Sequence, residues 1–345
     1  MKALVFHDVG QVRYVDTDDP QILAATDAIV RVSHCGICGS DLHIYEGREV
    51  GIEPGTVFGH ELVGEVVELG SSVSTLQPGD IVTAPFTTNC GECVHCKSGL
   101  TARCVNGQLF GWVENGEGLH GSHSELVRVP FADGTLMRLP AEVPAELGVL
   151  LGDNLSTAFF CVAQADLMKS GVNVVVGCGT VGSLAVMAAK HKGAECVVAV
   201  DGVPWRRERA KAAGADAVCS PEEAVNWVQE KTKGLGASSV MEAVGSIAAQ
   251  RLAFDLVQAG GTISTVGVHT DPGFSFSPVE AYNRNLTYRI GRCSARHYME
   301  IVVPLIGQLN LSTVITHEMA LSEGANAYKM FADRADGVGK IILRP

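Results

Sequence analysis

Hydrophobic and polar positions divide the chain into two stretches of different texture. Over residues 1–150, short β-branched runs such as 29–32 and 81–83 are separated by turn clusters such as 77–80. Helical periodicity is scarce in this stretch. The pattern therefore predicts a β-rich first part.

From about residue 154 onward, apolar strands alternate with helical segments. The expected strands are 173–176, 196–200, 239–243 and 261–268. The expected helices follow them, ending near 192 and 213 and spanning about 248–258. This alternation is the βαβ pattern of a doubly wound parallel sheet. A helix near 297–307 and a strand over 340–343 complete the prediction.

Length and charge narrow the possible functions. A chain of 345 residues suggests two domains. Its 26 Lys and Arg against 38 Asp and Glu leave a net charge of −12, which argues against a nucleic-acid or anionic-membrane partner. The uncharged run 170–189 is long enough to cross a bilayer, but its four glycines favour a buried strand, turn and helix. With no signal-peptide pattern, a cytoplasmic location is expected.

A glycine-rich turn follows the strand at 173–176. The run Gly177-Cys178-Gly179-Thr180-Val181-Gly182 fits G-x-G-x-x-G and leads into an apolar helix. Gly177 permits the tight turn, Gly179 lets a pyrophosphate approach the backbone, and Gly182 allows close packing of helix on strand. The free N–H groups at the helix start favour phosphate binding. We therefore expect a dinucleotide site that includes Thr180 and Val181.

The next strand ends at Asp201, 19 residues after Gly182. A carboxylate at this place accepts hydrogen bonds from the adenosine ribose and repels a 2′-phosphate, so NAD is predicted over NADP. Arg206 and Arg207 leave the alternative open, because they could either accept a 2′-phosphate or begin a solvated helix face.

Four cysteines form a compact cluster, C-x2-C-x2-C-x7-C, made of Cys90, Cys93, Cys96 and Cys104. Four thiolates so close in sequence can surround one tetrahedral Zn²⁺, and a closed site of this kind is structural. Disulfides and an iron–sulfur cluster are the alternatives; the cytosolic setting disfavours the first and the spacing disfavours the second.

Two further fragments carry a family resemblance. They are Cys35-Gly36-Ile37-Cys38-Gly39-Ser40-Asp41-Leu42-His43 and Gly59-His60-Glu61-Leu62-Val63-Gly64, the latter continuing to Gly70 and Val73. Together with the cysteine cluster and the late glycine motif, the chain resembles zinc-dependent medium-chain alcohol dehydrogenases over its whole length. The nearest resemblance is to secondary-alcohol and glutathione-independent formaldehyde dehydrogenases.

The resemblance implies an α/β fold with a GroES-like β-rich catalytic domain and a Rossmann domain, and a cleft between them. The implied boundaries are 1–154 with a zinc lobe near 88–106, 155–292 for NAD binding, and 293–345 returning to the catalytic domain. The family associates, so a homodimer or homotetramer is expected, with the strand 261–268 pairing across the dimer.

The resemblance also implies a catalytic zinc, the second of two per chain. Cys38 and His60 fall on its first two ligand positions, and Asp153 stands where some relatives have Cys. Glu61 could approach the metal directly. Taken alone, Cys38 would be a buried apolar residue, His60 a core histidine and Asp153 a helix N-cap.

In such a family member, Ser40 touches the substrate oxygen and His43 receives the proton through the cofactor ribose, while Asp41 orients the ligand histidine. Lys340 is expected either to contact the cofactor phosphates or to be a solvated residue on an edge strand. Trp112 and Phe159, with Phe86, are candidate linings of an apolar substrate pocket.

The sequence thus predicts a zinc-dependent oxidoreductase that transfers hydride between NAD and a small secondary or primary alcohol, or the matching ketone or aldehyde. A polyol, an amino alcohol or formaldehyde as substrate is an alternative within the family. A non-catalytic nucleotide-binding redox sensor is the alternative of another class.

Overall fold

The computed structural model describes residues 1–335 and 337–345, which form two compact units. The first unit comprises Met1–Ser156, Ser294–Gly307 and Ile315–Pro345. The second comprises Thr157–Cys293 and Gln308–Val314. Helix α5 (Asn154–Gln164) begins in the first unit and continues in the second. The segment 308–314, which the expected boundaries placed with the catalytic domain, is part of the second unit here; Arg209 donates hydrogen bonds to its Thr313 and Val314 carbonyls.

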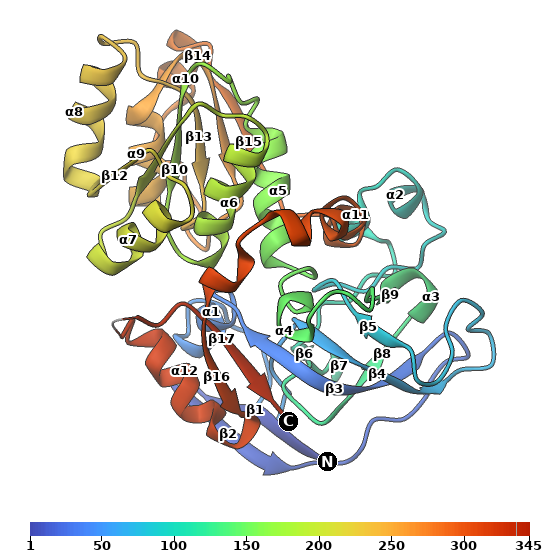
Figure 1. Cartoon of the computed structure of the whole chain (residues 1–345). Helices are drawn as coiled ribbons and strands as arrows, with labels where there is room; N and C mark the ends of the chain where they lie inside the picture. The colour runs from blue at the N-terminus through green and yellow to red at the C-terminus, as the bar shows by residue number, and fades with distance from the viewer. Residues whose placement is uncertain (336) are drawn as a thin grey trace. The chain divides into compact units, whose positions relative to one another are not determined.

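The first unit is built on a seven-stranded sheet (Figure 1). Its strand order is β16 (Ile315–Ala320), β17 (Lys340–Arg344), β3 (Ala28–Ile37), β4 (Leu62–Leu69), β5 (Ile81–Thr83) and β9 (Met137–Arg138), with β8 (Leu126–Val129) also paired to β3. Two hairpins accompany it: β1 (Lys2–Asp8) with β2 (Gln11–Asp16), and β6 (Trp112–Glu114) with β7 (Glu117–Leu119). The helices are α1 (Asp41–Tyr45), α2 (Val94–Lys97), α3 (Ala132–Thr135), α4 (Ala145–Gly148), α11 (Ala295–Val302) and α12 (Gly324–Ala332).

Apolar side chains from this sheet make the core of the first unit. Val30, Val32 and Leu62 are buried in it together with Phe58 and Tyr328, whose rings stack 5.4 Å apart. Alternation along β3 turns Arg31 outward between the two buried valines. The core therefore holds the two strand ends that bear the metal-ligand motifs.

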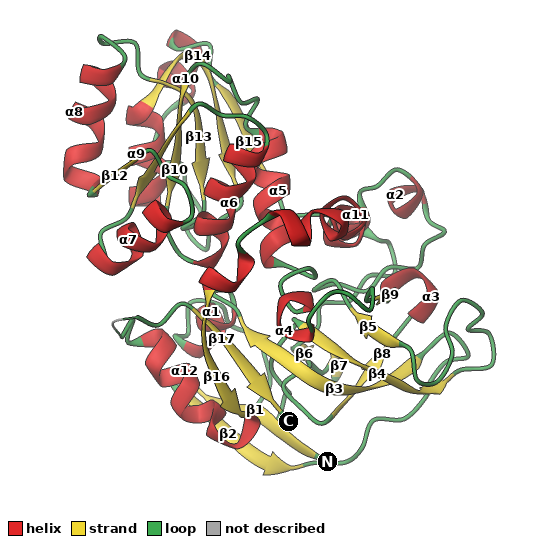
Figure 2. Cartoon of the chain, viewed as in Figure 1, coloured by secondary structure: helices red, strands yellow, loops and turns green. Residues whose placement is uncertain are grey.

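The second unit is a six-stranded parallel sheet with helices on both faces (Figure 2). Its strand order is β12 (Ala217–Cys219), β11 (Cys196–Val200), β10 (Val172–Val176), β13 (Ala237–Glu242), β14 (Val257–Thr265) and β15 (Thr287–Ile290). Its helices are α6 (Thr180–His191), α7 (Pro204–Ala212), α8 (Pro221–Lys231), α9 (Ile247–Leu256) and α10 (Pro278–Asn283). The order reverses at β10, which is the doubly wound arrangement, so the expected α/β fold class is confirmed.

Two expectations about strands and helices need revision. The strand expected to pair across a dimer, 261–268, is β14, and it is paired on both sides by β13 and β15. That prediction is therefore wrong, because a strand with both edges occupied has no free hydrogen-bonding groups for another chain. The helix expected near 297–307 is α11 followed by a 3-10 segment, Val303–Gln308.

The uncharged run 170–189 forms β10, the glycine turn and most of α6. Among the residues described, no helix is both long and apolar enough to span a bilayer.

Candidate active site and metal centres

Four ionisable side chains, a thiol, an imidazole and two carboxylates, converge in the first unit. Cys38 follows β3, His60 and Glu61 lead into β4, and Asp153 precedes α5. Their ligand atoms all lie within 4.8 Å of one another, and all four side chains are buried. The Asp153 Oδ2 atom is 3.0 Å from the Cys38 sulfur and 3.4 Å from His60 Nε2. The structure thus brings together the residues that the sequence singled out.

These separations suit a zinc ion. Bonds of about 2.0–2.3 Å in a tetrahedron place ligand atoms about 3.3–3.8 Å apart, close to the spacing of this group. One sulfur, one imidazole nitrogen and carboxylate oxygens also form a donor set that zinc accepts. The residues present therefore fit a catalytic zinc.

Burial makes the charges of this group strongly interdependent. Burial raises the pKa of Cys38, and the neighbouring Asp153 and Glu61 carboxylates raise it further. Burial alone would raise the pKa of Asp153, but the hydrogen bond with His60 and its charge lower it to about 2. Burial would lower the pKa of His60, but Asp41 and Asp153 raise it well above its usual range. A metal cation bound here would replace the protons on the Cys38 thiol and on His60 Nε2, and would therefore favour the thiolate and the neutral imidazole.

Two further residues of the first motif contact His60. Its Nδ1 atom lies 3.1 Å from Asp41 Oδ1, while Asp41 Oδ2 accepts the Cys38 backbone N–H at 2.8 Å. Asp41 therefore orients both an imidazole and the loop that bears the cysteine. The Ser40 hydroxyl lies 3.3 Å from His60 Nε2, at the same end of the ring as the ligand group.

His43 lies one turn further along α1 and is 5% exposed. Its Nδ1 atom has no hydrogen-bond partner among the described residues. Burial and the nearby Arg48 cation lower its pKa to about 4, against a weaker opposing effect of Asp41. The imidazole is therefore neutral at physiological pH.

Two residues at the site were not assigned to it from the sequence. Asn154 Nδ2 donates to Glu61 Oε1 at 2.9 Å and lies 3.3 Å from Asp153 Oδ2. Lys340 is 1% exposed; its ammonium forms an ion pair with Glu61 Oε2 and donates to the Ile37 carbonyl at 3.0 Å.

The expected solvated Lys340 on an edge strand is therefore wrong, because β17 lies between β16 and β3. A sequence signal was available: Lys340 begins a strand whose next three residues are apolar, and a buried lysine requires an anionic partner.

The four cysteines of the cluster also come together, with all four sulfur atoms within 4.8 Å. Backbone N–H groups point at them: the Cys93 N–H approaches Cys90 Sγ at 3.4 Å, and the Cys90 N–H approaches Cys104 Sγ at 3.3 Å. Amide donors from Cys96 and Val105 lower the pKa of Cys93 to about 6. The described cysteines are all free thiols, so the disulfide alternative finds no support.

The glycine turn of the second unit has the form a dinucleotide needs. Gly177 has φ +94°, which favours glycine, and a Cβ at Gly182 would collide with the Gly177 carbonyl. A Cβ at Gly179 would meet nothing within 4 Å, so the backbone there is open to a ligand. Thr180 and Val181 begin α6, whose first N–H groups are available to phosphates.

Asp201 directly follows β11, at the same end of the sheet as the glycine turn. Its two carboxylate oxygens accept the backbone N–H groups of Cys178 and Val203, each at 2.8 Å. Arg207 donates to the Asp201 carbonyl at 2.7 Å, and the Arg206 guanidinium lies 5.5 Å from the centre of the Trp205 ring. A buried strand end thus holds a carboxylate beside the glycine turn.

The pocket candidates lie in different units. Trp112 is half-buried on β6, and its Nε1 donates to Glu114 at 3.4 Å. Phe159 is 2% exposed on α5 and its ring contacts that of His191 at 6.0 Å, inside the second unit. Phe86 lies beside the ligand group, its ring 6.4 Å from that of His60. Pocket roles for Trp112 and Phe159 stay predictions.

Comparison with known proteins agrees with this geometry. Residues 24–141 match the alcohol dehydrogenase GroES-like domain and residues 180–307 match the zinc-binding dehydrogenase family. The chain is 37% identical to zinc-type alcohol dehydrogenase B of Aspergillus flavus, covering all of this chain and 81% of that protein. The alcohol dehydrogenase TADH from Thermus sp. ATN1 superposes with a TM-score of 0.93 at 36% identity, covering 100% of this chain and 99% of that one.

More distant relatives have other names. The chain is 29% identical to a sorbitol dehydrogenase of Halalkalibacterium halodurans, covering all of this chain and 99% of that protein. It is 28% identical to an L-threonine 3-dehydrogenase of Caldanaerobacter subterraneus, covering 92% and 91%. The GroES-like and doubly wound units, the zinc-type relatives and the two candidate metal-ligand groups lead to one conclusion: this chain is an oxidoreductase of the zinc-dependent medium-chain alcohol dehydrogenase family.

Proposed function

We propose that the protein interconverts a small secondary or primary alcohol and its ketone or aldehyde, with NAD as the hydride carrier. The buried group of Cys38, His60, Glu61 and Asp153 carries this proposal, with the Ser40 hydroxyl at its edge. Burying these four ionisable side chains together is costly, and a metal cation bound between them would offset that cost.

Cys38, His60 and Asp153 would hold the catalytic zinc, which when bound supplies a Lewis acid that lowers the pKa of an alcohol. Asp41 fixes the His60 tautomer by accepting from Nδ1, so that Nε2 presents its lone pair. Asn154 and Lys340 each hold one oxygen of the Glu61 carboxylate. Glu61 would therefore have to give up one of these contacts to bind the metal, so it would serve as an occasional ligand and not a permanent one. The cluster of Cys90, Cys93, Cys96 and Cys104 would hold the second, structural zinc.

Ser40 and His43 would move the alcohol proton. The Ser40 hydroxyl can accept the substrate proton while donating its own onward. Neutral His43 can receive it at the outer end of the relay, and its low pKa means that it soon passes the proton to water.

The glycine turn and Asp201 support NAD. Asp201 uses two lone pairs for Cys178 and Val203 and keeps others for ribose hydroxyls. Its negative charge would repel a 2′-phosphate, although Arg206 and Arg207 lie on the following helix. The cofactor role of Gly177, Gly179, Thr180, Val181, Gly182 and Arg206 is part of this proposal.

The aromatic ring of Phe86 beside His60 favours a small apolar substrate over a polyhydroxy one. The sorbitol and threonine dehydrogenases among the relatives make a polyol or an amino alcohol the second candidate.

Self-association through the second unit is also proposed. Strand β15 ends its sheet, with only β14 as partner among the described strands. Large apolar side chains near that edge are exposed: Ile290 by 51%, Phe274 by 62% and Tyr282 by 83%. An open edge flanked by apolar residues suits pairing with a second copy of this chain.

The test is a substrate panel measured with purified, zinc-loaded protein. Primary alcohols, secondary alcohols, polyols, amino alcohols and formaldehyde are each offered with NAD⁺ and with NADP⁺, and nicotinamide reduction is followed. We expect the highest kcat/KM for a small secondary or primary alcohol with NAD⁺. A higher value for polyols or amino alcohols would favour the second candidate. No turnover in protein that holds two zincs per chain would overturn the proposal for these substrates.

A further inference from the structure

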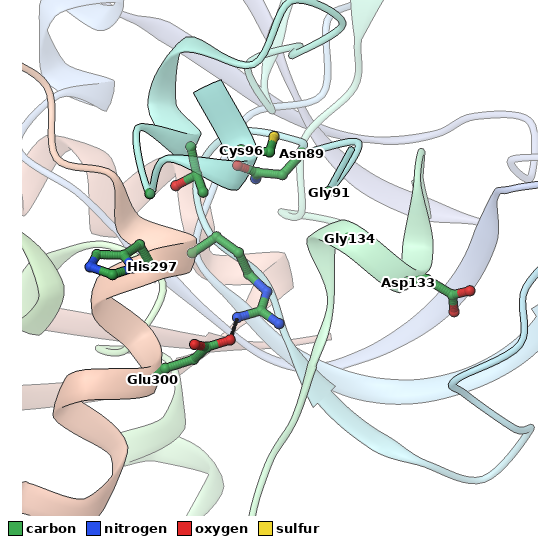
Figure 3. A pocket seen from close by; sticks show the side chains of 10 residues that line it. Asn89, Gly91, Cys96, Asp133, Gly134, His297 and Glu300 are labelled. Atoms are coloured by element: carbon green, nitrogen blue, oxygen red, sulfur yellow. Dashed lines mark hydrogen bonds and ion pairs between the residues drawn. The ribbon is translucent and has the colours of Figure 1, made fainter. Parts of the chain in front are cut away.

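A polar cavity lies between the four-cysteine lobe and helix α11 (Figure 3). Its volume is about 240 Å³. The lobe contributes Asn89, Cys96 and Thr101, and α11 contributes Arg296 and Glu300. All of these residues belong to the first unit, and none has a part in the proposed reaction.

Three buried polar atoms at this cavity have no hydrogen-bond partner among the described residues. They are Asn89 Oδ1, Thr101 Oγ1 and Arg296 Nε. Asn89 is 1% exposed and Thr101 7% exposed, so bulk water does not solvate them freely. Because an unsatisfied buried polar group costs about 1–3 kcal/mol, three around one cavity indicate a missing partner.

The orientation of the Asn89 amide is determined by its surroundings. Its Nδ2 donates to the Thr87 carbonyl at 2.6 Å, a contact that the amide oxygen could not make. The backbone of Asn89 is held as well, since its N–H donates to Thr135 Oγ1 at 2.9 Å. The side chain therefore turns its amide oxygen, an unpaired acceptor, away from Thr87.

Arg296 offers the complementary donor. Its Nη1 is paired with Glu300 Oε1 at 2.8 Å, so the guanidinium is held and its charge is largely balanced. Asp133 does not add a free acceptor, because its oxygens accept from Ser74 and Thr75, and Figure 3 shows its carboxylate turned away from the labelled residues Asn89 and Glu300. The buried unpaired groups at the cavity are thus one acceptor, one N–H donor and the Thr101 hydroxyl.

The net charge of the groups that line the cavity disfavours the binding of an anion. With zinc bound as proposed above, four thiolates around one divalent cation carry a net charge of about −2, and Cys96 is one of them. Glu300 balances Arg296, so no net positive charge remains to attract a carboxylate or phosphate. A neutral ligand avoids this cost.

We propose that this cavity is a binding site for a small neutral carboxamide. Its NH₂ group donates to Asn89 Oδ1, and its carbonyl oxygen, with two lone pairs, accepts from Arg296 Nε–H and the Thr101 hydroxyl. A carboxamide has the donors and the acceptor that these three atoms require, carried on two neighbouring atoms, whereas a hydroxyl has both on a single oxygen.

Acetamide is the probe that tests the site. Full-length protein is titrated with it and saturation-transfer NMR is recorded, and crystals are soaked in parallel. We expect saturable binding, with the amide located between Asn89, Thr101 and Arg296. Acetate at the same concentration is expected not to bind. Absence of acetamide binding, ordered water alone in the cavity, or equal binding of acetate would overturn the proposal.

Two substitutions at Thr101 supply the matched control. Thr101→Val keeps the shape and removes the hydroxyl, so acetamide affinity should fall by about fivefold. Thr101→Ser keeps the hydroxyl and should retain wild-type affinity. Equal affinities in the two variants would contradict the site. Because the charge argument depends on the proposed structural zinc, zinc is measured in each sample. Zinc on the four cysteines without acetamide binding refutes the cavity proposal alone, whereas crystals in which Cys90, Cys93, Cys96 and Cys104 hold no zinc refute the lobe assignment as well.

Discussion

At the scale of single residues, the candidate active site depends on polar groups that neutralise one another. Asp41 and Asp153 flank His60, and Lys340 pairs with Glu61, so each buried charge has a partner. Removing one member leaves another uncompensated in a medium of low dielectric, which is expensive. Single substitutions here should therefore have large and specific effects.

Asp153→Asn should lower the zinc content from two per chain to about one and reduce turnover by more than about a hundredfold, since even the outer partners of metal ligands contribute 10–100-fold. Metal analysis and kcat/KM for the best alcohol measure this. Asp216→Asn, on the surface of the second unit, is the control and should retain both zincs. Full zinc content with full activity in Asp153→Asn would remove this residue from the ligand set.

The stability of the chain should depend on His43 below neutral pH. The imidazole binds a proton near pH 6.5 when unfolded but only near pH 4 when folded, so the unfolded state takes up more protons in this window. Stability is therefore full above about pH 6.5 and falls as the pH drops toward 4. Urea unfolding at pH 7 and pH 5 should show a smaller difference in the free energy of unfolding for His43→Gln than for the wild type.

The same variant tests the proton relay: it should turn over more slowly at neutral pH and be partly rescued by added imidazole. An unchanged pH dependence of stability, or an unchanged rate, would contradict the corresponding role.

At the scale of secondary-structure elements, the glycines of the glycine turn serve two different purposes, the packing of a helix on a strand and the binding of a cofactor. Gly182 is required by the closeness of α6 to β10, because a Cβ would overlap the Gly177 carbonyl. Gly179 has φ −67° and open space at its Cβ position, so the free chain does not require glycine there. Two neighbouring glycines of one motif thus have different reasons to be glycine.

Gly182→Ala should destabilise the protein by about 2–3 kcal/mol, because backbone cannot move aside as a side chain can. Gly179→Ala should leave stability unchanged or raise it by about 0.5 kcal/mol, since alanine restricts the unfolded chain. Its KM for NAD⁺ should nevertheless rise about tenfold or more, because a methyl group blocks the approach of the pyrophosphate. Denaturation curves and initial rates measure the two effects. Equal KM values for Gly179→Ala and wild type would mean that the cofactor does not approach here.

At the scale of the whole molecule, the edge of the six-stranded sheet formed by β15 is the surface proposed to pair with a second copy of the chain. β15 is short, and Ile290 at its end is 51% exposed. A lysine placed on an edge strand opposes pairing between chains through like-charge repulsion. Self-association should therefore be sensitive to this position.

Ile290→Lys should shift the protein toward the monomer in sedimentation velocity, while the wild type sediments as a dimer or larger. Ile81→Lys is a matched control on an exposed apolar residue of the first unit, 46% exposed, and should sediment as the wild type does. An Ile290→Lys protein of wild-type size would place the interface elsewhere.

The sequence by itself determined the features that depend on short spacing. The glycine turn, the four-cysteine cluster and the Cys38–His43 motif are local, so the distance between their members along the chain constrains their geometry. The alternation of strands and helices likewise predicted the doubly wound sheet, because each element must bury one apolar face. The helix α8 was not predicted, since its polar face dominates the pattern.

Only the tertiary structure decided which distant residues meet. Asp153 reaches Cys38 across 115 positions, and Lys340 reaches Glu61 across 279. The second contact depends on the pairing of β17 with β3, in a register that sets Ile341 opposite Ile37. No local pattern encodes such a register. The same is true of the open edge at β15, because the order of β14 and β15 in the sheet determines which of the two lacks a neighbour.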